Sequence, residues 1–320
     1  MKILIRRFRR DCWSATAMIQ EYFGRGTALF ALGLFLAVSG GAVHAAQPAQ
    51  PAKPPAKAVK PSIKTEQPLF AVLEPKAIDL LKATSSRLAA ARSMKFTAVI
   101  SYEAPSRFGP ALVYTTKSEV TMQRPDKLKI ITPGDGPASE FYYDGKVMMA
   151  YAPKENLVAV ADAPPTIDDM LQFAFHSAEI YYPFSDLIVT DPYVGLANKM
   201  ELAFYIGQST AVGGTTTDML AFANDDVFVQ IWIGAEDKLP RRMRAVYRKD
   251  PLRLRHELEL SNWQLDPTVA QEEFASEKAK GATRIKFGHP STMLPPKVKP
   301  VFLRQPSTNP PTNSAPAKTK

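Results

Sequence analysis

The sequence predicts an α+β fold in which a long antiparallel sheet follows one helix and is interrupted by a short helical insert. Three observations support this prediction. Apolar residues recur at helical spacing over Glu74–Arg92 and again after Thr166. From Phe96 onward, apolar and polar residues instead alternate in about ten short runs. Tight turns separate these runs, which is typical of antiparallel strands.

The first helix is predicted from the stripe that Ile78, Leu81 and Leu88 form. Residues three, four or seven positions apart lie on one face of a helix. Glu74-Pro75 suits the N-terminus, because proline has no amide hydrogen to lose there and an acidic side chain interacts favourably with the helix dipole. The helix is therefore expected to lay one apolar face on the sheet.

The strands of the first half are predicted from alternation and from one turn. Asp144-Gly145 separates two short apolar runs, which is a strong signal for a β-hairpin. The strands expected before the helical insert are 96–102, 112–120, 141–143, 146–151 and 157–161.

Thr166 is predicted to cap the helical insert, with Asp168 and Asp169 in its first turn. Adjacent helical residues point about 100° apart, so we interpret these carboxylates as acids of a helix start and not as a catalytic pair. A further helical turn is expected over 183–189, and strands resume beyond it. They are expected at 201–207, 216–223, 227–233, 241–248 and 254–260.

Two charged groups lie among the later strands. Asp225-Asp226 follows Asn224 and is interpreted as a turn, with a weak Ca²⁺ contact as the alternative. Arg242 and Arg244 share one strand face, so an anionic headgroup or phosphate site is one interpretation. We favour cross-strand pairing with the glutamates of the 254–260 strand.

The first 45 residues predict an export signal that is cleaved near Ala45. Basic residues precede an apolar run over 27–38, and Val43 and Ala45 supply the small residues before the cleavage point. The run has roughly 12 residues, well short of the ~20 that a spanning helix needs. The only cysteine, Cys12, lies in the segment to be removed. A periplasmic location without disulfides is therefore expected.

Pro-, Ala- and Lys-rich segments flank the predicted folded part. Residues 46–69 and 291–320 hold few large apolar side chains and are predicted to be a disordered linker and tail. Residues 69–290 carry 25 basic and 28 acidic groups, so the basic charge belongs to the ends, and a nucleic-acid-binding domain is not expected. The basic ends are interpreted as solvated tethers, with peripheral contact to membrane or cell wall as the alternative. One folded domain is expected over 70–290.

Several sequence blocks, taken in order, resemble a family of exported bacterial proteins. They include Phe141–Lys146, Ala163–Asp169, Gln230–Ile233, Leu260–Trp263 and Gly281-Ala282. On these blocks the chain is identified as a member of the predicted periplasmic domain-of-unknown-function family 2092. This family resembles the lipoprotein carriers LolA and LolB and the mycobacterial lipoprotein LppX. The resemblance implies a strongly curved sheet, an incomplete β-barrel, with helices as a lid over a cavity for acyl chains or lipids.

No sequence motif indicates catalysis, a cofactor or a metal. A nucleophile elbow, a phosphate loop and a dinucleotide fingerprint are all missing from the sequence. His176, His256 and His289 lack the spacing of zinc ligands. His256 lies on the apolar side of its strand, and we interpret it as a half-buried, hydrogen-bonded histidine and not as a proton-linked switch.

We therefore expect a non-enzymatic protein that binds or carries a hydrophobic small molecule, a lipid or a lipoprotein. The alternative is an envelope protein-interaction or regulatory module on the same fold. Residues 166–177 are expected to form the lid. Strand parity and helix position select apolar residues for the cavity wall, although the same positions also fit ordinary core. These predicted ligand-binding residues are Met148, Met170, Phe173, Phe204, Ile231, Ile233, Leu258 and Leu260.

Overall fold

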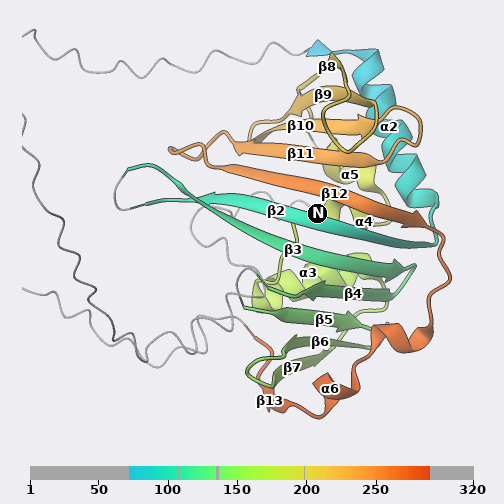
Figure 1. Cartoon of the computed structure of the whole chain (residues 1–320), viewed down its shortest axis with the longest axis vertical. Helices are drawn as coiled ribbons and strands as arrows, with labels where there is room; N and C mark the ends of the chain where they lie inside the picture. The colour runs from blue at the N-terminus through green and yellow to red at the C-terminus, as the bar shows by residue number, and fades with distance from the viewer. Residues whose placement is uncertain (1–71, 107–108, 135–136, 198, 289–320) are drawn as a thin grey trace, which may run out of the picture.

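The computed structural model describes residues 72–106, 109–134, 137–197 and 199–288 (Figure 1). The predicted signal peptide, the 46–69 linker and the 291–320 tail lie outside the described residues. The strands of the described part are β1 (Val72–Leu73), β2 (Ser93–Ala104), β3 (Leu112–Gln123), β4 (Lys127–Thr132), β5 (Ser139–Tyr143), β6 (Val147–Ala152), β7 (Leu157–Asp162), β8 (Leu202–Ser209), β9 (Thr217–Ala223), β10 (Val227–Gly234), β11 (Pro240–Tyr247), β12 (Arg255–Leu265) and β13 (Thr283–Ile285).

Six helical segments accompany these strands within the described residues. They are α2 (Pro75–Ala90), α3 (Ile167–Ala178), α4 (Ser185–Ile188), α5 (Pro192–Leu196), the 3₁₀ turn η1 (Gln271–Phe274) and α6 (Glu277–Lys280). None of the described helices has both the length and the apolar character that crossing a membrane requires.

All thirteen described strands belong to one sheet, in the order β1-β8-β9-β10-β11-β12-β2-β3-β4-β5-β6-β7-β13. Neighbouring strands are antiparallel, except that β1 pairs parallel with β8 and β13 parallel with β7. The central β12–β2 pairing joins the two halves of the sheet. Since β1 and β13 lie at opposite edges, the sheet does not close into a barrel (Figure 1). The predicted unclosed antiparallel sheet with few helices is confirmed.

Helix α2 begins at Pro75, as predicted, and its apolar stripe is buried. Ala77 and Leu81 pack against apolar residues of β8, β9 and β10. Glu74 ties the helix start to the sheet, because its carboxylate accepts a hydrogen bond from the backbone N–H of Tyr205 at 2.8 Å. α2 is thereby fixed to the first half of the sheet.

Helix α3 has the predicted start. The Thr166 hydroxyl accepts a hydrogen bond from the Asp169 backbone N–H at 3.1 Å. The helix ends at Ala178 and is capped by Glu179, which has a left-handed backbone (φ 55°) and donates its N–H to carbonyls of the last turn. Helices α3, α4 and α5 lie behind the sheet in Figure 1. We call the face that they cover the inner face.

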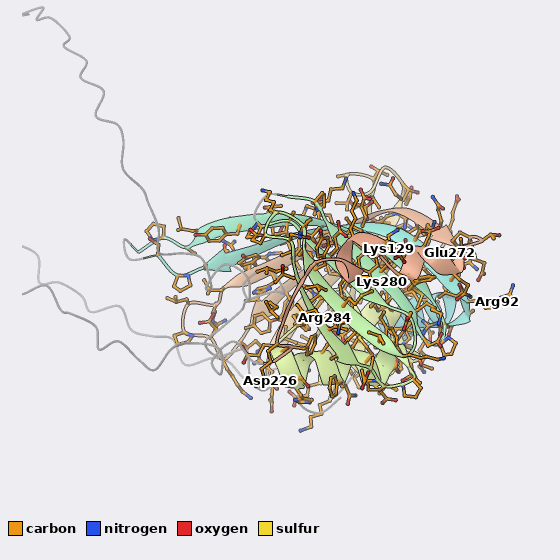
Figure 2. All side chains as sticks on the ribbon, turned by 90° about the horizontal axis from the view of Figure 1, so that it is seen from below. Arg92, Lys129, Asp226, Glu272, Lys280 and Arg284 are labelled. Atoms are coloured by element: carbon orange, nitrogen blue, oxygen red, sulfur yellow. The ribbon has the colours of Figure 1, made fainter. Side chains whose placement is uncertain are left out.

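The other side of the sheet, the outer face, also carries apolar contacts. Ala279 and Ala282 of the C-terminal segment pack there on Tyr142, Met149 and neighbouring apolar residues. Glu273 of η1 pairs with Lys95 and Lys129, with nitrogen–oxygen distances of 3.2 and 3.5 Å. Figure 2 labels Lys129 and, on η1, Glu272, which precedes Glu273 in the chain. Strands β5–β7 are therefore covered on both faces.

Candidate ligand-binding site

The apolar interior on the inner face holds six of the eight residues predicted to bind ligand. Four of them belong to the cluster beneath α3 and α4, and each is at most 5% exposed. These four are Met148, Met170, Leu258 and Leu260. Ile231 and Ile233 belong to a second cluster, beneath α2. Two neighbouring cores therefore hold these six side chains.

The other two predicted residues lie elsewhere. Phe173 is on α3 and is 40% exposed. Phe204 pairs with Ala221, whereas Ile231 pairs with the adjacent Leu220. Because neighbouring strand residues point to opposite faces, Phe204 lies on the outer face, away from Ile231. Ligand contact by the eight residues stays a prediction, and the structure brings only six of them to the inner face.

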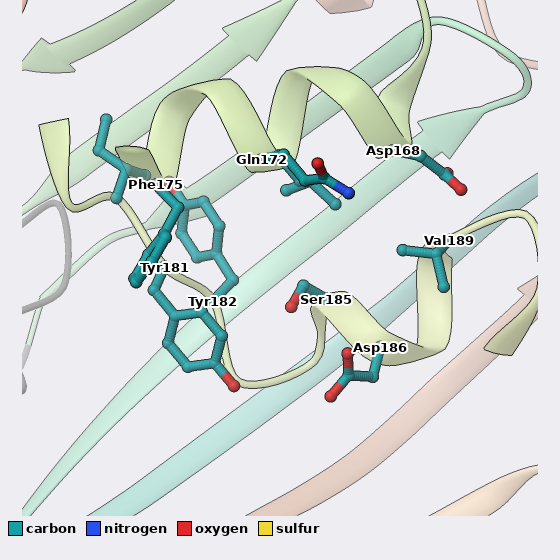
Figure 3. Close-up of a pocket in the computed structure, with 10 residues that line it drawn as sticks. Asp168, Gln172, Phe175, Tyr181, Tyr182, Ser185, Asp186 and Val189 are labelled. Atoms are coloured by element: carbon teal, nitrogen blue, oxygen red, sulfur yellow. The ribbon is translucent and has the colours of Figure 1, made fainter. Parts of the chain in front are cut away.

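A small cavity of about 50 Å³ lies between α3 and the segment 180–189 (Figure 3). Its walls combine apolar and polar side chains. The lining residues are Asp168, Leu171, Gln172, Phe175, Ile180, Tyr181, Tyr182, Ser185, Asp186 and Val189. Ligand pockets for drug-sized molecules occupy about 300–1,000 Å³, so this cavity accommodates a small chemical group and not an acyl chain.

The cavity adjoins the main apolar interior. Ile180 and Tyr182, which line it, belong to the same buried cluster as Met148 and Met170. Leu171, on the α3 side of the cavity, packs against that cluster as well. An outward movement of α3 would therefore join the cavity to a continuous apolar surface.

Asp186 and Tyr182 give this cavity its chemical character. Burial raises the pKa of the Asp186 carboxyl, and none of the described residues donates a hydrogen bond to it. Solvent reaches part of the Asp186 residue, while protein atoms surround most of its carboxyl. The Tyr182 side chain is 7% exposed, and burial raises the pKa of its hydroxyl. A carboxylate in such surroundings is costly unless it is protonated or meets a cation.

Asp168, in contrast, has partners. Its carboxylate accepts hydrogen bonds from the Thr190 backbone N–H at 3.0 Å and from the Thr190 hydroxyl at 3.2 Å. Arg124 lies close enough for a Coulomb interaction with Asp168, and burial lowers the pKa of that arginine. The Arg124 guanidinium donates to the carbonyl oxygen of Val189 at 3.0 Å. These contacts hold the start of α3 against the end of the segment 180–189.

An aromatic cluster occupies the inner face at the C-terminal ends of β2 and β11 and the N-terminal ends of β3 and β12. The Tyr102 and Tyr114 rings stack with centroids 5.7 Å apart, and the Tyr247 ring meets His256 edge-on at 5.2 Å. Burial lowers the pKa of His256 to about 4. The imidazole is therefore neutral at physiological pH, and its predicted place on the apolar side of the strand is confirmed.

The arginines of β11 form ion pairs across the sheet. Arg242 lies 2.5 Å from Glu257, and Arg244 lies 3.5 Å from the same carboxylate. Glu259 also lies 3.8 Å from Arg242. The cross-strand pairing that we favoured is confirmed, since glutamates already neutralise the arginines that suggested a headgroup site.

Sequence reasoning missed the importance of the segment 180–189. One signal was available, because Ser185-Asp186 interrupts an otherwise apolar run that ends in Leu187-Ile188-Val189. A buried acid in such a run is a candidate functional residue. Within the described residues, no group of three or more His, Cys, Asp or Glu side chains is arranged to hold a metal ion.

The fold and the site define a protein with an unclosed sheet, a helical cover and a small polar cavity beneath it. The chain belongs to the family described as predicted periplasmic protein DUF2092, whose model matches residues 77–288. This match confirms the family membership and the periplasmic location expected from the sequence. No curated protein matches the chain.

Solved structures with similar folds include MucB, with 14% identity and a TM-score of 0.37. The match covers 64% of this chain, which spans only 64% of that MucB chain. The lipoprotein LppX from Mycobacterium tuberculosis matches with 10% identity and a TM-score of 0.40, over 62% of this chain and 99% of LppX. A LolA superfamily protein from Nitrosomonas europaea matches with 8% identity and a TM-score of 0.30, over 63% and 98%.

Proposed function

We propose that this protein is a non-enzymatic periplasmic carrier that holds the acyl chain of a lipid or lipoprotein between the sheet and α3. The observation that supports this most directly is the continuity between the surface cavity and the apolar cluster of Met148 and Met170. Methionine side chains adapt to different shapes, so such an interior can repack around a flexible chain. α3 acts as the lid in this proposal.

The size of the cavity determines how binding proceeds. At about 50 Å³ it admits no acyl chain, so α3 moves outward when ligand enters. Each buried methylene contributes about 0.8 kcal/mol, so a ten-carbon chain gains about 8 kcal/mol before the cost of moving the lid. Micromolar affinity corresponds to about 8 kcal/mol of net binding energy, so a ten-carbon chain binds more weakly than this once the cost of displacing α3 is subtracted.

Native mass spectrometry of the exported chain purified from a periplasm tests this proposal. We expect a bound mass that denaturation releases and that matches a fatty acid, a phospholipid or an acylated peptide. For the delipidated protein, titration with alcohols of six to twelve carbons is expected to tighten binding about fourfold per added methylene. An affinity that does not depend on chain length contradicts acyl-chain burial.

A protein-interaction role is the second candidate, and the outer face of β8–β10 favours it. Phe204, Phe228 and Trp232 are half-buried there, and no helix of the described part packs on them. A photo-crosslinking residue in place of Phe228 is expected to capture a periplasmic partner if this role applies, and one in place of Ser261 serves as the control. Equal labelling at both positions contradicts a specific partner.

A further inference from the structure

Two hairpins carry an apolar and basic surface that lies apart from the interior beneath α3. One hairpin joins β2 to β3 and the other joins β11 to β12, and Figure 1 shows both reaching beyond the neighbouring strands on the same side of the sheet. A groove of about 390 Å³ lies between them, and Ala111 of one hairpin and Leu252 of the other both line it. The exposed surfaces of the two hairpins are therefore continuous. We call the following residues the tip surface: Leu112, Val113, Tyr114, Lys249, Leu252, Arg253 and Arg255.

The apolar residues of the tip surface are exposed on both sides of the sheet. Leu112 and Val113 are adjacent in β3, so their side chains point to opposite faces, yet each residue is more than half exposed. Leu252, on the other hairpin, is also more than half exposed. A single exposed apolar residue is ordinary, whereas a cluster of them marks an interaction site. Because both faces of the β3 end are apolar, a partner that covers them has to surround the hairpin.

Basic residues lie beside these apolar ones. The segment 248–255 contains four basic residues and one acidic residue, Asp250. The Asp250 carboxylate accepts hydrogen bonds from two backbone N–H groups of its own hairpin, at 3.0 and 3.3 Å, so it is engaged within the turn. Lys249 and Arg255 pair with acids of the β9–β10 turn and of β2, but in each pair the basic side chain is more than half exposed and the acid less than a third. The hairpin therefore presents mainly positive charge to its surroundings.

We infer that the tip surface inserts into the interface of an anionic phospholipid bilayer. In such an interface apolar side chains reach the boundary of the acyl chains, while lysine and arginine contact the lipid phosphates. Tyr114 suits the same depth, because its ring is apolar and its hydroxyl is polar. A bilayer encloses a protruding hairpin on all sides, which covers both Leu112 and Val113. The inference goes beyond the proposed function, because it concerns where the protein meets a membrane and holds whether or not the interior takes up an acyl chain.

A protein partner and a second copy of the chain fit this surface less well. The cores of protein interfaces are depleted of charged residues, whereas here basic residues directly flank the apolar ones. A second copy would bring two basic tip surfaces together, and like charges across an interface repel. An anionic bilayer supplies both an apolar phase and negative charge, so it matches both parts of the tip surface.

Flotation of the delipidated exported chain with vesicles tests the inference. One set of vesicles is phosphatidylcholine alone, and the other contains one part of phosphatidylglycerol to three parts of phosphatidylcholine. We expect binding to the anionic vesicles to be at least about tenfold tighter. The basic ends of the chain, 46–69 and 291–320, are the same in every variant. Differences between variants therefore report on the tip surface.

Two matched pairs of variants separate the basic from the apolar contribution. Lys249→Gln should weaken binding to anionic vesicles about fivefold. Lys280→Gln is its control and should leave binding unchanged, because Lys280 is also more than half exposed and also pairs with an acid at 2.7 Å, but lies on α6. Val113→Ser should likewise weaken binding about fivefold. Its control is Val194→Ser, since Val194 is also more than half exposed but lies on α5.

A polarity-sensitive dye distinguishes insertion from adsorption. The only cysteine, Cys12, precedes the predicted cleavage point, so Val113→Cys places a dye at one position of the exported chain. The emission of that dye should shift to the blue with anionic vesicles. A dye at Lys146→Cys should not respond, because Lys146 is exposed on the β5–β6 turn at the opposite end of the strands.

Three results would overturn the inference. Equal weakening by each variant and its control would assign vesicle binding to the overall charge of the chain. A dye at position 113 that does not respond would mean that the hairpin stays outside the bilayer. If the wild type binds neither kind of vesicle, the tip surface is not a membrane site, and crosslinking from position 113 to a single protein would assign it to a protein partner. Alcohol titration of the interior is a separate measurement, so failure of the carrier function and failure of membrane docking are distinguishable.

Discussion

Replacing Met170 by alanine tests whether α3 covers a ligand-accessible interior. Met170 lies on α3, and its side chain is fully buried in the same cluster as Met148 and Leu260. Met170→Ala removes three heavy atoms and leaves a space within this cluster, which also contains the cavity residues Ile180 and Tyr182. We expect lower stability together with stronger binding of alkyl ligands.

The magnitude follows from burial. Truncation of a buried methionine to alanine costs about 2–5 kcal/mol, part of which is the cost of the new space. For a domain of this size, a loss of about 3 kcal/mol lowers Tm by roughly 6–12 °C. Phe173→Ala is the control on the same helix, and its loss should be about 1 kcal/mol because the side chain is 40% exposed.

Thermal melts with and without saturating decanol measure both effects. The alcohol should raise the Tm of Met170→Ala more than that of the wild type, because its chain fills the vacated space. Two results would refute the reasoning. Equal Tm losses for the two variants would mean that α3 does not seal the interior, and an equal rise with decanol in variant and wild type would mean that ligand binds elsewhere.

Three further predictions concern the rest of the domain. His256 has a folded pKa of about 4 against 6.5 in the unfolded chain, so the unfolded state binds its proton first. The stability that the neutral His256 side chain contributes is therefore complete above pH 6.5, and it falls by up to about 3 kcal/mol as the pH is lowered toward 4. Urea melts of His256→Gln should not show this decrease. Gly145→Ala should cost about 2–3 kcal/mol, because Gly145 has φ +91° and a Cβ atom there would lie 2.3 Å from the Asp126 carboxylate. Gly214→Ala, with φ +64° and open space, should cost only about 1 kcal/mol in the same denaturation assay, and equal losses would contradict the clash. Glu257→Ala leaves Arg242 and Arg244 facing each other, so it should cost about 1 kcal/mol at low salt and less in 1 M salt, without changing decanol binding.

Local patterns predicted the elements whose signals lie within one short stretch of sequence. The Thr166 cap, the Asp144-Gly145 turn and the stripe of α2 all appear in the structure where they were expected. Strand β4 was missed, and so were β1 and β13. The last two have two and three residues, and their parallel pairing with distant strands defines them, which no local pattern shows.

The site was harder to predict because it depends on how strands face one another. Alternation shows which residues of one strand share a face, but it does not show which face of the next strand matches. The pairing of β8 with β9 shifts between Tyr205 and Gly207, and Phe204 lies on the face opposite to Ile231. The burial of Asp186 is likewise invisible in sequence, because it arises only when α3 folds over the segment 180–189.

The contacts of α3 also determine how the lid would open. Its first half is held by the Thr166 cap, by the Asp168–Thr190 hydrogen bonds and by the buried Met170. Its second half buries Ala174 and Ala178, whose side chains remove little apolar area from water. We therefore expect amide hydrogen exchange to be faster at residues 174–178 than at 170–173, and decanol to change exchange mainly in the second half. Uniform exchange along the helix would contradict opening from its C-terminal end, where Phe175 lines the cavity.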